Sequence, residues 1–170
     1  MNWTALITSE VEDAYRATDG LMNLVDDDML DWHPQAEGEW MTTRRLLRHL
    51  SDACGWCAAN FVYDRWPQVM EGKPEDQPPE SVESVAEAKS ELAMDKERVL
   101  KAVADAGEEA LATRMIAAPW DPTERPLGQH VLQMVAHLAQ HKMQLFYYLK
   151  LRGKPVNTYT LYGIPEPPSA

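Results

Sequence analysis

Apolar residues recur at helical spacing in four long segments of this sequence, and no other feature restricts its fold as strongly. From Trp3 to Val25 they form a heptad-like stripe that buries one face of a helix. No segment shows the alternation of apolar and polar residues that a half-buried strand requires. We therefore expect one all-α domain over residues 1–170, a four-helix bundle. Its helices are expected at roughly 3–25, 43–64, 82–107 and 127–152, with a C-terminal tail at 153–170.

The expected helices are separated by segments rich in residues that stop a helix. Prolines crowd residues 66–80, and because each lacks an amide donor we expect a long loop with no regular element. Ser84 and Glu87 match a capping box that starts the next helix. Residues 108–126 form another irregular connection, and Pro126 suits the first position of the last helix. The second and third connections of the bundle are therefore long.

Charge and hydropathy exclude several classes of partner. Sixteen basic against twenty-seven acidic residues give a net charge of −11, which opposes binding to nucleic acid. Apolar runs stay well below the roughly 18 residues needed to cross a bilayer, so we expect no membrane partner. The N-terminal residues lack the pattern of a secretory signal, so we expect a cytoplasmic location. Residues 126–165 contain no carboxylate, and a metal site there must draw on histidine.

His137 and His141 are the first candidate metal ligands. They lie four residues apart in the last expected helix, so their side chains share one face with Cβ atoms about 6 Å apart. That face continues through apolar residues and points into the bundle. Two neutral imidazoles in a core need specific hydrogen-bond partners or a cation. The alternative interpretation is that one of the two is an ordinary hydrogen-bonded core histidine and the other lies at the rim of the bundle, with no metal.

A third ligand must come from another helix, and His49 is the best candidate. It lies beside the apolar stripe of the second expected helix, whereas His33 precedes a proline in a loop. His130 lies two helical turns before His137 and is also a poorer candidate. Three imidazoles with an open fourth position match catalytic zinc-type sites. The Glu-x-x-His and His-Glu-x-x-His motifs of other metal enzymes do not occur in the sequence.

Cys54 and Cys57 form a CxxC motif that competes with the histidine site. A thioredoxin-type dithiol follows a strand and opens a helix, whereas this pair is expected about eleven residues into a helix. A structural zinc site made of both cysteines with His137 and His141 is a second alternative. Two buried apolar cysteines are the third. The sequence favours this last reading.

Three sequence segments resemble the DinB-like (damage-inducible) superfamily of metal-binding four-helix bundles. The first runs from Leu30-Asp31-Trp32-His33-Pro34 through Glu39-Trp40-Met41-Thr42 into Leu46-Leu47-Arg48-His49-Leu50. The second is His137-Leu138-Ala139-Gln140-His141-Lys142-Met143-Gln144, and the third is Tyr148-Leu149-Lys150-Leu151-Arg152-Gly153-Lys154-Pro155-Val156. Many members continue their final-helix ligand as His-Arg-Gly-Gln, but here only the glutamine, Gln144, agrees. The resemblance spans nearly the whole chain.

The resemblance implies a metal site and leaves the reaction open. It makes His49, His137 and His141 the ligands of one divalent metal ion, zinc or nickel, and suggests a homodimer. Relatives include transferases and isomerases that use a low-molecular-weight thiol, so a small-molecule thiol and an electrophilic substrate are the implied partners. Metal-activated water in a hydrolase, or a non-catalytic metal-binding stress or interaction protein, are the alternatives.

Two further expectations concern the surroundings of the metal. Trp40, Trp56 and Tyr148 are candidates for the walls of a substrate pocket. A hydrolase also needs a general acid or base, and the first helix, with Glu10, Glu12 and Asp13, is a candidate source. No individual catalytic residue is assigned from the sequence.

Overall fold

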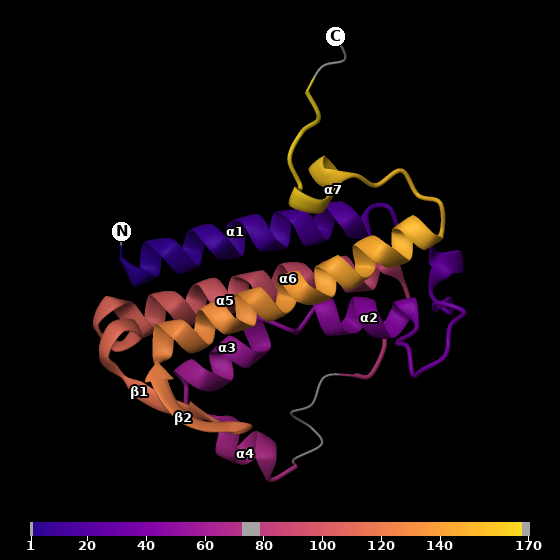
Figure 1. The fold of residues 1–170 in the computed structure, drawn as a ribbon. Coiled ribbons are helices and arrows are strands. Elements are labelled where there is room, and N and C mark those ends of the chain that lie inside the picture. Colours follow the sequence, from indigo (N-terminus) through magenta and orange to yellow (C-terminus); the bar gives the residue numbers. More distant parts are fainter. Residues whose placement is uncertain (1, 73–78, 168–170) are drawn as a thin grey trace.

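The computed structural model describes residues 2–72 and 79–167, and most of this chain is helical. Three long helices, α1 (Trp3–Met22), α5 (Val85–Thr113) and α6 (Leu127–Leu151), run side by side (Figure 1). Two shorter helices, α2 (Thr43–Leu50) and α3 (Gly55–Val62), follow each other along α6 and take the fourth position of the bundle. The expected all-α bundle is confirmed.

Smaller elements decorate the bundle at its ends and along α1. A short helix and a two-stranded antiparallel hairpin lie together at one end, and a last helical turn packs on α1 (Figure 1). These elements are η1 (Asp27–Met29), α4 (Trp66–Met70), β1 (Met115–Ala118), β2 (Asp121–Pro126) and α7 (Thr158–Tyr162). Among the described helices, none is long and apolar enough to pass through a bilayer.

The prediction of a single helix over residues 43–64 is wrong, because the helical backbone is interrupted between α2 and α3. The fully buried carboxylate of Asp95, on α5, accepts hydrogen bonds from the amides of Gly55 and Trp56, each at 2.7 Å. It therefore caps the first turn of α3 from another helix. The helices touch here, since a Cβ atom on Gly55 would lie 2.0 Å from the carbonyl oxygen of Asp95. Only glycine permits this approach.

Two expected loops also contain regular structure. Pro67 lies in the first turn of α4, where a missing amide is tolerated, and part of the remaining 66–80 segment lies outside the described residues. In the hairpin Met115 pairs with Pro126 and Ala118 with Asp121. Proline is acceptable there because each strand of a two-stranded sheet has one unpaired edge. The expectation that the chain lacks strands was therefore wrong for residues 115–126.

The other helix ends lie close to their expected positions, with one exception. Ser84 accepts a hydrogen bond from the Glu87 amide at 3.1 Å and caps α5 as predicted, whereas the Glu87 carboxylate accepts from the amide of Glu83, one residue before the expected partner. Gly107 was expected to end this helix, and its φ of 69° does interrupt the regular backbone. Helical structure resumes and continues to Thr113, because Leu111 beyond the kink is fully buried in the core.

Candidate metal centre

Three histidine side chains from two helices converge on one point. His137 and His141 project from consecutive turns of α6, and His49 approaches from α2. The ring of His49 lies 4.2 Å from that of His141 and 5.1 Å from that of His137, centroid to centroid. One nitrogen from each ring lies within 4.8 Å of the other two. The structure thus brings together the three histidines singled out in the sequence.

The three rings are half-buried, and burial lowers the pKa of two of them, His49 and His137. Burial, followed by the neighbouring rings of His141 and His137, lowers the pKa of His49 to about 4. Burial and His141 also lower the pKa of His137. Near neutral pH both rings are therefore uncharged and present nitrogen lone pairs. The Nε2 atoms of His49 and His137 lie 3.0 Å apart, and a cation between such lone pairs would satisfy both nitrogens at once.

A chain of hydrogen bonds orients His141. Its Nδ1 lies 3.1 Å from Oε1 of Gln144, whose amide donates to the hydroxyl of Tyr148 at 3.1 Å. Tyr148 in turn donates to the main-chain carbonyl of Met41 at 2.9 Å. Because the Gln144 oxygen can only accept, His141 carries its proton on Nδ1, and its Nε2 is left to face the other histidines. Metal-binding histidines are commonly fixed in this way.

Asp52 is a neighbour of the triad that the sequence reasoning missed. Its Oδ1 lies 4.0 Å from Nδ1 of His49, and its Oδ2 accepts from Arg48 at 3.2 Å. Burial raises the pKa of Asp52 to about 6, while the charge of Arg48 acts in the opposite direction. A carboxylate placed behind a ligating histidine is a recurrent arrangement in metal sites. The available signal was the three-residue spacing of His49 and Asp52.

The two remaining histidines lie outside the triad. His130 is fully buried, its Nε2 lies 2.9 Å from the Ile116 carbonyl, and its ring stacks on Phe61. His33 has its Nδ1 3.0 Å from the carbonyl of Pro34, in the loop before α2. Neither belongs to a group of ligand atoms close enough to share an ion, among the residues that the structure describes.

The cysteines are placed differently from the sequence expectation. Cys54 stands at the N-cap of α3, not deep inside a helix, but Asp95 already occupies that helix end. Burial, as the largest cause, raises the pKa of both thiols, that of Cys57 to about 12. A reactive thiolate is therefore disfavoured. Within the described chain neither cysteine joins the histidine cluster, so the mixed cysteine and histidine site was wrong.

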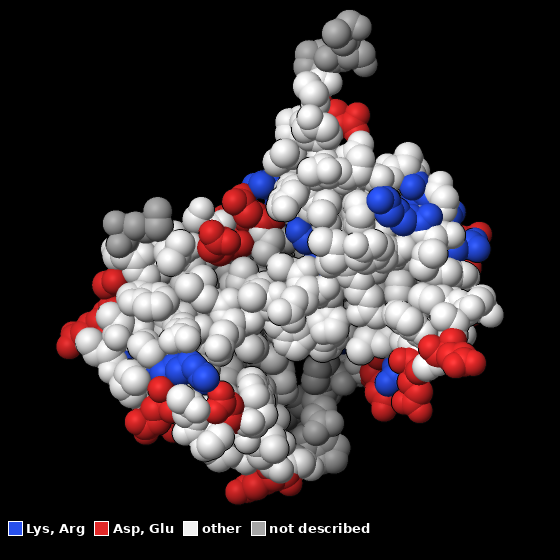
Figure 2. Space-filling view, in the orientation of Figure 1, with Lys and Arg blue, Asp and Glu red and all other residues white. Residues whose placement is uncertain are grey.

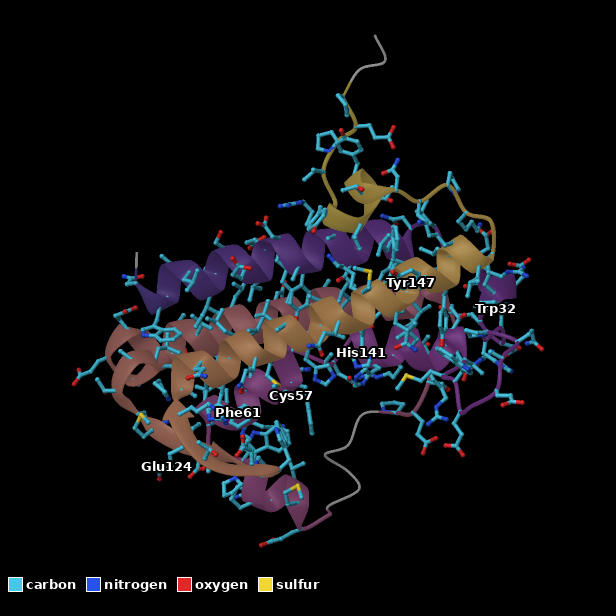
Figure 3. All side chains as sticks on the ribbon, viewed as in Figure 1. Trp32, Cys57, Phe61, Glu124, His141 and Tyr147 are labelled. Carbon is cyan, nitrogen blue, oxygen red and sulfur yellow. The ribbon has the colours of Figure 1, made fainter. Side chains whose placement is uncertain are left out.

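A cavity of about 520 Å³ opens beside His137. Its walls come from α3, from the hairpin and from α6, and Figure 3 shows Cys57 and His141 on the same side of α6. None of the three aromatic residues expected as walls lines it: Trp40 is exposed in a loop, Trp56 packs on Trp66, and Tyr148 is buried. The lining residues are Cys57, Ala118, Trp120, Asp121, Arg125, Gln133, Met134, Ala136, His137 and Gln140.

The acidic residues of α1 do not line this cavity. Glu10 and Asp13 line another cavity, between α1 and α6, and Glu12 pairs with Lys96 at 2.6 Å. The expectation that α1 supplies a general base to the metal was therefore wrong. The helical periodicity of α1 does not show which of the two cavities its acidic residues line, because this depends on how α1 packs in the bundle.

Comparison with known sequences agrees with this geometry. The sequence model of the DinB superfamily matches residues 10–145, which include both α2 and the two histidines of α6. The chain belongs to the DinB superfamily. The resemblance noted in the sequence is thereby confirmed, and the DinB assignment accounts for a helical bundle with a histidine triad that can hold a metal ion. No curated protein and no solved structure matches the chain significantly.

Proposed function

We propose that this protein binds one divalent metal ion, zinc or nickel, on His49, His137 and His141 and uses it to activate a small-molecule thiol. The observation that carries the proposal is the convergence of three imidazole nitrogens within 4.8 Å of one another. Imidazole suits zinc and nickel, and three protein ligands leave a coordination position open, as in catalytic sites. A closed structural site would need a fourth ligand.

The residues around the triad fit such an ion. His49 and His137 are uncharged near neutral pH, and Gln144 holds the proton of His141 on the nitrogen that faces away. The bound ion would lower the pKa of a thiol or water molecule at its open position. The adjoining cavity has the volume of a small-molecule site, so substrate can reach His137 from one side.

The surrounding groups support thiol chemistry over hydrolysis. A hydrolase needs a general base close to the reacting water, whereas Asp52 lies behind His49, on its Nδ1 side. A thiol would release its proton to solvent, and its sulfur would then attack an electrophilic carbon in the cavity, whose displaced electron pair passes to the leaving group or to an adjacent electronegative atom. We therefore place this protein among thiol-dependent transferases or isomerases, with metal-activated water as the second reaction and a non-catalytic metal-binding protein as the alternative.

Metal analysis of protein purified without an affinity tag tests the first step. We expect one equivalent of metal in the wild type, a loss in His137→Ala, and retention in His33→Ala, which removes a histidine outside the triad. A wild type without stoichiometric metal would refute the proposal. The loaded protein is then incubated with a panel of thiols and an electrophile. Absence of metal-dependent conjugation with every thiol would favour the non-catalytic alternative.

We further propose that the protein acts as a cytoplasmic homodimer that pairs through the exposed face of α6. Met143, Tyr147 and Leu151 are exposed and follow each other at four-residue spacing. Figure 2 shows few charged side chains along this face, although the chain as a whole is strongly acidic. Light scattering of the wild type and of Tyr147→Glu tests the pairing, and a monomeric wild type would contradict it.

A further inference from the structure

The cavity beside His137 has a single charged pair in its lining, and the hairpin supplies it. Of the described residues that line the cavity, Asp121 and Arg125 carry charge, and both belong to β2. The facing wall on α6 contributes amides and small or apolar side chains, including Gln133 and Gln140. A small molecule in this cavity would lie beside His137, between the α6 wall and the hairpin.

Arg125 is held in place by its strand and by its ion pair. Its backbone lies in β2 opposite Ile116, and its Nη1 donates to Oδ2 of Asp121 at 2.7 Å. The Asp121 carboxylate also accepts from the Thr123 amide at 3.0 Å. That amide, and then Arg125, lower the pKa of Asp121 to about 2. The aspartate is therefore ionised and already has partners on both of its oxygens.

The guanidinium keeps unused donors. An arginine side chain has five N–H groups, and one of them is used by Asp121. The planar fork of the remaining donors matches a carboxylate, which can accept two parallel hydrogen bonds. The Arg125 side chain is 26% exposed, so its charge is less screened than that of an arginine at the open surface.

The charge balance around the cavity also favours an anionic ligand. The whole α6 segment lacks carboxylates, and the charge of Asp121 is offset by Arg125. Imidazole is a neutral ligand, so a bound ion would keep its full positive charge. An anion is repelled by most surfaces of a chain with a net charge of −11, but it meets donors in this cavity.

We propose that Arg125 binds a carboxylate group of the small molecule that reaches the histidine triad, so that the substrates of this site are carboxylic acids. Trp120, which is 61% exposed and also lines the cavity, offers an apolar ring surface to the carbon skeleton. Arg125 is then a specificity residue: it selects the substrate while the triad holds the metal. The inference rests on the proposed metal function.

Cobalt-loaded protein tests the inference by binding. A thiolate that ligates Co²⁺ produces a charge-transfer absorption band, so titration yields dissociation constants without any turnover. The probes are 3-mercaptopropionate and its uncharged analogue 3-mercaptopropanol. We expect the wild type to prefer the carboxylate. We expect Arg125→Gln to bind it about ten- to hundredfold more weakly, the size of one charge-assisted pair, with little change for the alcohol.

Two further variants sharpen the result. Asp121→Asn frees the guanidinium from its partner, so we expect tighter binding of 3-mercaptopropionate. Arg152→Gln removes an exposed arginine at the end of α6 and serves as the matched control, with wild-type binding expected. An unchanged cobalt ligand-field spectrum in Arg125→Gln shows that the triad is intact in that variant.

The failures of the two proposals are distinguishable. If the wild type binds no stoichiometric Co²⁺, the metal proposal fails and the inference fails with it. If Co²⁺ binds but the wild type takes both thiols equally, or Arg125→Gln keeps the preference, the carboxylate inference alone is overturned. The wild-type comparison of the two thiols decides the matter even if the Arg125 variant does not fold.

Discussion

Gln144 is the residue through which the surroundings of the metal site can be tested most directly. It accepts from Nδ1 of His141 at 3.1 Å and donates to Tyr148, which is anchored on the Met41 carbonyl. Gln144→Ala removes the acceptor and leaves all three histidines in place. Loss of such an outer partner typically lowers metal affinity about 10- to 100-fold, or about 1.4 to 2.8 kcal/mol. We expect Zn²⁺ affinity to fall by this amount.

Competition with a chromophoric chelator measures the affinity, and two variants serve as controls. Gln129→Ala removes an exposed glutamine from the same helix and should bind Zn²⁺ as the wild type does. Gln144→Glu keeps an acceptor oxygen and should retain or exceed wild-type affinity. An affinity of Gln144→Ala within twofold of the wild type would refute the reasoning. So would equal losses in the alanine and glutamate variants, because the acceptor would then not matter.

Three further predictions concern stability and metal removal. Asp95→Ala leaves the donors of Tyr15, Gly55 and Trp56 without a partner. Urea unfolding should therefore show a free energy of unfolding lower by about 3–5 kcal/mol, and a smaller decrease in Asp95→Asn. A decrease under about 1 kcal/mol in Asp95→Ala would contradict this. Gly55→Ala should destabilise the fold by about 1–3 kcal/mol, because its Cβ would collide with Asp95. Gly20→Ala lies in α1 with open space around its Cβ and should stabilise the fold by up to about 1 kcal/mol. Equal effects of the two substitutions would argue against the close contact at Gly55. Chelation of a metal present at a thousandfold excess over its dissociation constant should remove about 4 kcal/mol of stability, visible as a lower Tm, and an unchanged Tm would count against a bound ion.

Much of the helical framework was predictable because its determinants are local. The stripes of α1 and α6 repeat at helical spacing, and Ser84 caps α5 through a residue only three positions away. The break before α3 was not predictable, since its cause, Asp95, lies 40 residues from Gly55. The hairpin was missed because its prolines resemble those of an irregular loop, and their tolerance depends on which strand edge they occupy.

The candidate site divides in the same way. The pairing of His137 and His141 follows from helix geometry alone, because side chains four residues apart lie on one face. The apolar stripe around His49 made it the best third candidate, but only the fold shows that α2 brings it to α6, since the two helices are far apart in the chain. Asp52 and Gln144 lie three residues from their histidines, but local spacing does not reveal that each side chain turns towards its neighbour.

The sequence by itself thus determined a bundle of amphipathic helices, its membership of the DinB superfamily and a histidine pair on its last helix. The bundle and the histidine pair depend on periodicity and spacing within a segment, whereas the superfamily rests on the match of residues 10–145 to its sequence model. Only the tertiary structure decided which residues line the cavity beside His137: Trp120, Asp121 and Arg125 of the hairpin do, and the three expected aromatic residues do not. The physical reason is that a cavity forms between elements, and its chemistry depends on packing contacts between residues far apart in the chain.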